Sequence, residues 1–190
     1  MNLQEKWGQR KTTQEALTLF DGLPAIGIED MMGRWTGAEL PTNHALDGVL
    51  GVARWKGKTF RSANDVDPLV HEGFFGRFAV NPALMPLGLA MHARFLRNGL
   101  TTFLFLLSQP IIGTRKPKAR LRMIDFRGVV SATMIYDAKP INDHFRKFSD
   151  DEVIGLMDVR DIDHAEAGLG LARANDRLGQ QEEKRGQAIP

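Results

Sequence analysis

Cysteine is absent from the 190-residue chain. Its absence excludes disulfide bonds, thiolate metal sites, iron–sulfur clusters and a cysteine nucleophile. Long hydrophobic runs are absent too: the longest, from Phe103 to Leu107 and less continuously to Ile112, is shorter than the roughly 20 residues that a membrane-spanning helix needs. The first residues show no apolar core of a secretory signal, so we expect a cytoplasmic protein.

Acidic residues are missing from a long central stretch, since no Asp or Glu occurs between Gly73 and Ile124. The basic residues there are Arg77, Arg94, Arg97, Arg115, Lys116, Lys118, Arg120 and Arg122. This asymmetry indicates either an anionic partner or membrane surface, or an attraction between two parts of one fold. Nucleic acid is not an expected partner, because the stretch lacks interleaved surface aromatics and any known DNA or RNA motif.

The rest of the composition is that of a globular protein, with 43% hydrophobic and 25% charged residues and a net charge of +2. These values exclude a fibrous or wholly disordered chain. We expect one domain over residues 29–173, preceded by an N-terminal helical extension over 1–28 and followed by a polar tail over 174–190.

Alternation of side chains predicts several strands. Gly33, Trp35 and Gly37 share one face of an extended segment. Residues 119–126 and 129–136 form a hairpin across Arg127-Gly128, and residues 153–159 form a further strand. Residues 73–81 could be a strand or a loop. Lys56-Gly57-Lys58 is typical of a tight hairpin turn.

Helices are predicted in four places. A capped short helix follows Thr12 or Thr13 and ends before Gly22, and a second helix opens at residues 41–43. A short helical turn follows Pro140. The longest helical and apolar region covers residues 82–112.

This arrangement of elements favours a mainly β fold with helical additions. Sequential strands joined by hairpins, with the main helices confined to one stretch, indicate an antiparallel sheet rather than a parallel α/β fold. A curved antiparallel sheet of this length tends to close into a barrel, because closure removes its edges. Residues 82–112 would then form a helical lid over one mouth of that barrel.

Two segments carry a family resemblance. Gly33-Arg34-Trp35-Thr36-Gly37 matches a Gly-x-Trp-x-Gly pattern, and residues 134–146 with 155–158 are similar to the second half of the same family. Residues 81–86 also fit. The chain thus resembles a bacterial and fungal family of unassigned function that is named after this motif. After Asp158 it departs from the family, reading AEAGLGLARAN in place of an aromatic final strand.

The resemblance implies a calycin-like barrel. Lipocalins, fatty-acid-binding proteins and nitrobindins have barrels that begin with a strand carrying such a tryptophan, so the implication is one of analogy. Trp35 itself is interpreted either as a wall of a ligand site or as a structural plug at the closed base of the barrel.

Tyr136, the only tyrosine, is the first candidate site residue. Val130, Ala132, Met134 and Tyr136 share an apolar face that should point inward. A phenol at the end of that face could donate to a ligand carbonyl or act as a general acid beside Asp137. The alternative is a hydroxyl bonded to the backbone.

His144 lies in the sequence Asp143-His144-Phe145-Arg146. A histidine beside carboxylates could be a proton shuttle with a raised pKa. Alternatively, Asp143 caps a helical turn or pairs with Arg146. His44 is a second histidine candidate.

Arg122 is the candidate for binding a carboxylate. If Arg120 and Arg122 face inward, they resemble the buried guanidinium with which fatty-acid-binding barrels hold their ligand. If they face outward, they extend the basic surface.

No histidine spacing indicates a metal site, and no cofactor is expected. Haem, which needs one axial histidine in an apolar pocket, is an alternative suggested by the nitrobindin analogy.

The expected function is the binding of a small apolar or amphipathic molecule in a barrel cavity under the lid. The expected walls are Trp35, Trp55, Phe60, Met134 and Met157, and the expected polar contacts are Tyr136, Asp137, His144 and Arg122.

One alternative is a cofactor-independent isomerase, cyclase or lyase that uses Tyr136 with Asp137 or His144. Another is a structural protein with a filled barrel. A weak membrane contact of the helical region is a further alternative, and the oligomeric state stays open.

Overall fold

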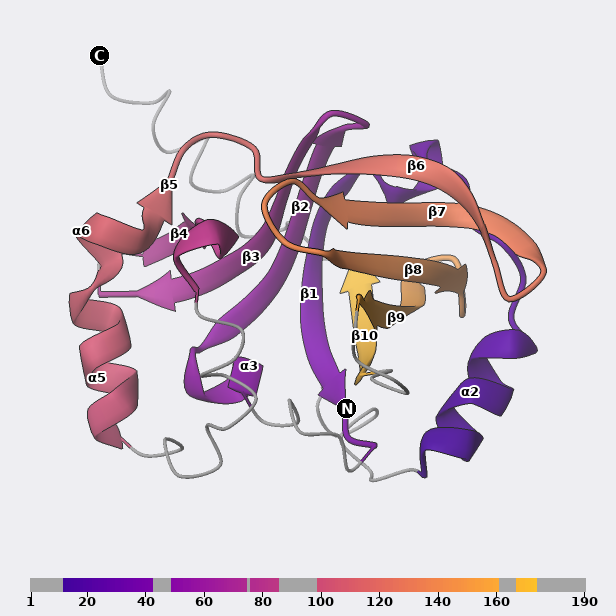
Figure 1. Ribbon diagram of the computed structural model, residues 1–190, viewed down its shortest axis with the longest axis horizontal. Coiled ribbons are helices and arrows are strands. Elements are labelled where there is room, and N and C mark those ends of the chain that lie inside the picture. The colour runs from indigo at the N-terminus through magenta and orange to yellow at the C-terminus, as the bar shows by residue number, and fades with distance from the viewer. Residues whose placement is uncertain (1–11, 43–48, 75, 86–98, 161–166, 174–190) are drawn as a thin grey trace, which may run out of the picture.

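The computed structural model describes residues 12–42, 49–74, 76–85, 99–160 and 167–173. Over these ranges the chain forms a strongly curved antiparallel sheet with a few short helices at its margins (Figure 1). The prediction of a mainly β, antiparallel fold is confirmed. In the same ranges, no helix is both long and apolar enough to cross a bilayer.

Ten strands make up the described sheet, in the order β2-β1-β10-β9-β8-β7-β6-β3-β4-β5, and β2 also pairs with β3. Their bounds are β1 Gly33–Leu40, β2 Trp55–Ser62, β3 Asp65–Gly73, β4 Gly76–Val80, β5 Gly113–Thr114, β6 Ala119–Phe126, β7 Val129–Tyr136, β8 Ile141–Lys147, β9 Glu152–Val159 and β10 Ala167–Arg173. The junction between β3 and β6 is short, with Val66 opposite Ala119 as its one paired position.

The hairpin of β6 and β7 has the predicted bounds and turn. Ala119 lies opposite Tyr136 and Phe126 opposite Val129. The turn residues have positive φ, 53° at Arg127 and 76° at Gly128. A two-residue turn of this kind matches the right-handed twist of the flanking strands.

The prediction of a turn at Lys56-Gly57-Lys58 is wrong, because these residues lie inside β2. The chain reverses instead after Ser62, which pairs with Asp65. Gly57 has a φ of +137° and lies against the carbonyl of Trp35. Its conformational freedom therefore serves an irregularity within the strand rather than a turn.

The prediction of a helical turn after Pro140 is also wrong, since Ile141–Lys147 is strand β8. Both faces of this strand are buried. Its sequence nevertheless mixes apolar and polar residues, so it shows neither the alternation of a half-exposed strand nor the continuous apolar run of a buried one.

The first predicted helix is present as α2, Thr13–Asp21, with the capping box of Thr12 and Glu15 at its start. Helix α2 packs its buried Phe20 on the outside of the sheet, against Ile154 and Leu156 of β9.

The predicted helical region of residues 82–112 is present in part. It contains a 3-10 turn at Pro82–Leu84, helix α5 at Gly99–Leu107 and helix α6 at Gln109–Ile112. Residues 86–98 lie outside the described part. The second predicted helix is described only in its last part, as α3 at Val49–Val52. Residues 43–48, which include the candidate His44, lie outside the described residues. Residues 29–31 form another 3-10 turn.

The main core lies between the strands and receives side chains from seven of them. Its members from the sheet are Trp35, Trp55, Phe60, Val66, Ala119, Leu121, Ala132, Met134, Tyr136, Ile141, Phe145, Val153 and Val159. We call this cluster the inner core. It includes residues of β1, β2 and β3, three of the strands that border the candidate site.

Candidate functional site

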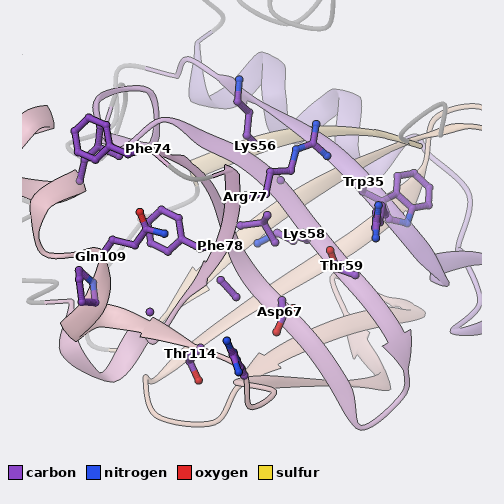
Figure 2. Close-up of a pocket in the computed structure, with 18 of the residues that line it drawn as sticks. Trp35, Lys56, Lys58, Thr59, Asp67, Phe74, Arg77, Phe78, Gln109 and Thr114 are labelled. Carbon is purple, nitrogen blue, oxygen red and sulfur yellow. The ribbon is translucent and has the colours of Figure 1, made fainter. Parts of the chain in front are cut away.

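A cavity of about 920 Å³ lies beside β2, β3 and β4 and is bordered by α5 and α6 (Figure 2). Its apolar lining comes from both the sheet and the helices: Trp35, Val70, Phe74, Phe78, Ala79, Leu106, Leu107 and Pro110. Its basic lining residues are Arg34, Lys56, Lys58, Arg61, Arg77 and Arg115. The cavity thus combines an apolar wall with a basic one.

Asp67 is the one carboxylate in this lining. It is hydrogen-bonded to Arg61, whose guanidinium also donates to Asp65 at 2.7 Å. The hydrogen bond with Asp67, reinforced by Asp65, raises the pKa of Arg61. Arg61 and Asp67 therefore neutralise each other, and the remaining lining charges are positive.

Lys58 lines the cavity, and its side chain is almost completely buried. Its Nζ lies 2.8 Å from Oδ2 of Asp143 on β8. The ammonium also donates to the carbonyl of Pro68 at 3.2 Å and to the Tyr136 hydroxyl at 3.4 Å. We call Lys58, Asp143 and Tyr136 the buried polar triad.

The triad arises from strand alternation. On β8, Asp143 shares a face with Ile141 and Phe145, which belong to the inner core. Asp143 lies opposite Met134 in the β7–β8 register. Its Oδ1 is buried and accepts no hydrogen bond from the described residues, so its acceptor capacity is left unused by them.

Tyr136 keeps its proton at neutral pH. Burial raises the pKa of the phenol well above its ordinary value of 10.0, and the charge of Asp143 raises it further. The hydroxyl can therefore donate one hydrogen bond while it accepts another from Lys58.

The Gly-x-Trp-x-Gly motif has a packing role beside this triad. The ring nitrogen of Trp35 donates to the carbonyl of Met31 at 2.7 Å. An ideal Cβ on Gly37 would lie 2.0 Å from Cη2 of Trp55. The indole of Trp55 in turn lies 5.6 Å from Nζ of Lys58, and the Tyr136 ring lies at the same distance. The motif thus holds an aromatic surface against a buried cation.

The structure brings several of the predicted wall residues together. Trp35, Trp55, Phe60 and Met134 are in the inner core, and the half-buried Met157 packs against it. Trp35 alone among these five also lines the cavity.

Asp137 does not join Tyr136, and this predicted partnership is wrong. Asp137 is exposed and forms an ion pair with Arg120. It follows the end of β7, where alternation directs its side chain away from the inner core.

His144 is also separated from Tyr136, because it lies on the other face of β8 from Asp143. Its ring stacks on Phe126 at a centroid distance of 3.7 Å, and its Nδ1 bonds to the Thr133 hydroxyl at 2.9 Å. Burial lowers the pKa of His144 despite the opposing effect of Asp158. The predicted raised pKa is therefore wrong.

Arg122 faces outward, which is the second of the two predicted orientations. Its guanidinium donates to Oδ1 of Asn64 at 2.9 Å. Leu121 takes the inward position on β6. Arg122 consequently lies outside the inner core, and its predicted role as a buried carboxylate ligand is wrong.

Sequence reasoning missed Lys58, which it placed in a turn, and the pairing of Asp143 with it, because Asp143 was considered only as a neighbour of His144, a helix cap or a partner of Arg146. The available signal for Asp143 was its position between Ile141 and Phe145 on one face of a strand; the sequence around Lys58 carried no such signal. His71 was also missed: its Nδ1 bonds to the Ala53 carbonyl at 2.6 Å, and it packs between Phe78 and Phe105. Burial lowers the pKa of His71 to about 4.

No cluster of three or more His, Asp or Glu suited to a metal ion occurs in the described ranges.

Comparisons with known proteins agree with the motif. The model of the GXWXG protein family matches residues 18–76, and that of a domain of unknown function (DUF4334) matches residues 117–169. A crystal structure of a protein from Thermomonospora curvata is similar, with 27% sequence identity, a TM-score of 0.67, and coverage of 90% of this chain and 94% of that chain. No curated protein matches. The resemblance found in the sequence is thus confirmed, and the chain belongs to the GXWXG family with a DUF4334 C-terminal part.

Proposed function

We propose that the protein binds a small amphipathic molecule with an anionic head group in the cavity between β2–β4 and α5–α6. The observation that carries this proposal is the lining of the cavity, which is apolar on one part and basic on another. The sequence predicted an apolar or amphipathic ligand, and the basic lining favours the amphipathic anion.

The size of the cavity supports a ligand of ordinary metabolite or lipid dimensions. Its volume of about 920 Å³ lies within the range of roughly 300–1,000 Å³ typical of small-molecule sites. Phe74, Phe78 and Leu106 offer apolar contact to a hydrocarbon portion, and burial of that portion would supply most of the affinity.

The basic residues support an anionic head group. The side chains of Lys56, Arg77 and Arg115 form no hydrogen bond or ion pair with any residue in the described part of the chain. Arginine binds carboxylate and phosphate through two parallel hydrogen bonds, and a cavity of one charge sign raises the local concentration of the opposite ion.

We further propose that the sheet works as a barrel with α5 and α6 as its lid. The pairing order supports this: β2 contacts both β1 and β3, and β3 meets β6, so the strand contacts return to their starting point. Leu106, Leu107, Gln109 and Pro110 of the two helices line the cavity, as a lid over a ligand would.

Competition binding tests the proposal. The purified protein is loaded with the fluorescent anion 8-anilinonaphthalene-1-sulfonate and titrated with decanoate, decyl phosphate, decanol or decyltrimethylammonium. The two anions should displace the dye at concentrations at least tenfold lower than decanol, and the cation should be weakest. Equal displacement by all four ligands would contradict the anionic preference.

A matched pair of arginine variants locates the site. Arg77→Gln, in the cavity lining, should weaken decanoate about tenfold and leave decanol unchanged, because a charge-assisted hydrogen bond is worth roughly 1.5–3 kcal/mol. Arg120→Gln is the control, because Arg120 pairs with Asp137 outside the cavity lining. An equal effect of both variants would place the anion elsewhere.

A second candidate function is proton-transfer catalysis on a carbonyl compound, which the buried polar triad favours. The Lys58 ammonium donates to the Tyr136 hydroxyl and pairs with the Asp143 carboxylate, and Lys58 is the member of the triad that lines the cavity. In such a reaction Asp143 would remove a proton from the carbon next to a carbonyl, the electron pair would move onto the carbonyl oxygen, and the ammonium and the hydroxyl would stabilise the resulting enolate. Return of the proton to the same or a neighbouring carbon would complete an exchange or an isomerisation.

Hydrogen exchange tests this second function. The protein is incubated with 2-decanone in D2O, and loss of the α-hydrogen signals is followed by proton NMR. Catalysis predicts exchange at least tenfold faster than in buffer, lost in Asp143→Asn and retained in Asp137→Asn. Exchange at the buffer rate, or equal loss in both variants, would reject the triad as a catalytic site.

A further inference from the structure

Helix α5 presents its apolar side chains to solvent. Leu100, Phe103, Leu104 and Leu107 are each more than half exposed. They recur at the spacing of positions that share one face of an α-helix. Leu106, on a different face, is buried. The helix therefore turns an apolar stripe outward, the reverse of what a surface helix of a globular protein does.

The apolar surface continues beyond α5. The ring of exposed Phe74, at the β3–β4 connection, lies 6.3 Å from that of Phe103, and Ile111 of α6 is 76% exposed. We call the following set the α5 face: Phe74, Leu100, Phe103, Leu104, Leu107 and Ile111. Most of the large hydrophobic residues that the described part exposes belong to it; the others are Leu84, Met123 and Val130. A contiguous apolar patch of this kind indicates an interaction surface.

The charge around the α5 face is positive. Arg77 on β4 and Arg115 and Lys116 after β5 are exposed. No acidic residue occurs from Gly73 to Ile124, the stretch that contains the whole face. A second copy of the chain is a poor partner, because a twofold interface would bring the same positive charges together. An anionic surface with an apolar interior matches both features.

We propose that the α5 face docks on the surface of an anionic lipid bilayer. Helix α5, with nine residues, is too short to span a bilayer but can lie in the plane of the head groups with its apolar side in the acyl region. The flanking arginine and lysine side chains then contact the negative lipid head groups. Figure 1 shows α5 and α6 at the opposite margin of the molecule from α2, so docking leaves the α2 side free.

The docking face adjoins the cavity, since Phe74 and Leu107 belong to both. A bound bilayer would therefore lie next to the site proposed for an amphipathic anion. The docking proposal itself does not rest on that ligand, because vesicle binding is measured without it.

The absence of cysteine in the chain permits a direct test. Leu104→Cys is labelled with the environment-sensitive dye NBD and mixed with vesicles of phosphatidylcholine and phosphatidylglycerol in a 3:1 ratio. Insertion of the α5 face should shift the emission to the blue and raise its intensity at least twofold. Val130→Cys, exposed on β7, is the matched control and should show neither change. Equal responses at both positions, or none at residue 104, would overturn the proposal.

Sedimentation with the same vesicles measures affinity. Phe103→Ser with Leu104→Ser should weaken binding at least tenfold, whereas Met123→Ser with Val130→Ser should leave it unchanged. Lys116→Gln should weaken binding about fivefold, and Lys147→Gln, at the α2 side of the sheet, should not.

Binding should fall with salt and be much weaker to pure phosphatidylcholine. Equal binding to both vesicle types would overturn the anionic requirement. If the double variant of Phe103→Ser and Leu104→Ser loses a dimer and keeps its vesicle binding, the occupant of the α5 face is a second copy of the chain and the proposal is wrong.

Discussion

The indole ring of Trp55 on β2 occupies the space that a side chain on Gly37 of β1 would need: an ideal Cβ there would lie 2.0 Å from Cη2 and 2.2 Å from Cζ3 of the ring. The second glycine of the family motif is therefore explained by a close approach of a neighbouring aromatic ring. The ring belongs to the inner core beside Lys58. The motif thus supports the wall of the buried polar triad.

Gly37→Ala should destabilise the protein by at least about 1–3 kcal/mol, the usual cost of overpacking a core. Urea unfolding followed by circular dichroism measures this. Gly99→Ala is the control, since a Cβ at Gly99 meets no atom of the described residues within 4 Å, and it should change stability by less than about 1 kcal/mol. Gly37→Ala combined with Trp55→Leu should cost less than the sum of the two single changes. Additive costs would contradict the proposed contact.

Lys58→Met should destabilise the protein by about 3–5 kcal/mol, because it leaves the Asp143 carboxylate buried without its cation. Asp143→Leu should be similarly costly. The double variant should be more stable than either single variant, since no unpaired charge is left. A double-mutant cycle in urea gives the coupling energy, and a value near zero would contradict the buried ion pair.

Acid should destabilise the protein partly through His71. Its pKa is lowered from 6.5 to about 4 in the folded state, so the unfolded chain takes up a proton first as the pH falls. The stability contribution is complete above about pH 6.5, declines between pH 6.5 and 4, and amounts to about 3 kcal/mol. His71→Asn should show a shallower loss of stability over this window. The lowered pKa of His144 makes the same contribution to the loss of stability in the unchanged protein and in the variant, so it does not affect the comparison. Equal slopes would refute the burial of a neutral His71.

Asp137→Asn should have little effect on stability, below about 1 kcal/mol, because its ion pair with Arg120 is exposed. It should also leave decanoate binding unchanged. Arg77→Gln serves as the positive control in the same titration. A tenfold loss of binding in Asp137→Asn would restore Asp137 as a site residue.

The sequence was sufficient to predict the antiparallel class, the capped helix at Thr13 and the β6–β7 hairpin, because each depends on local patterns. The inward direction of Ala132, Met134 and Tyr136 followed from the alternation of their strand, whereas the same prediction was wrong for Val130, which is 54% exposed. The partners of Tyr136 did not follow: Lys58 lies 78 positions away along the chain, on β2, and Asp143 belongs to β8, a segment in which the sequence indicated a helical turn. Local signals were misleading at both positions: a glycine between lysines indicates a turn, and an aspartate after a proline indicates a cap.

The cavity was beyond sequence reasoning for the same reason. Its lining joins Arg34 of β1 to Arg115 after β5 and Leu106 of α5, and these segments meet only once the sheet curves. The exposed apolar stripe of α5 was visible as a sequence pattern. The side of the helix that faces solvent depends on tertiary packing and could not be read from it.

A crystal structure of the protein soaked with decyl phosphate tests the central claim most directly. The account predicts the phosphate within hydrogen-bond distance of Arg77 or Arg115 and the alkyl chain against Phe78 and Leu106. Density for the ligand outside the space between β2–β4 and α5–α6, or no density at concentrations that displace the fluorescent dye, would contradict it.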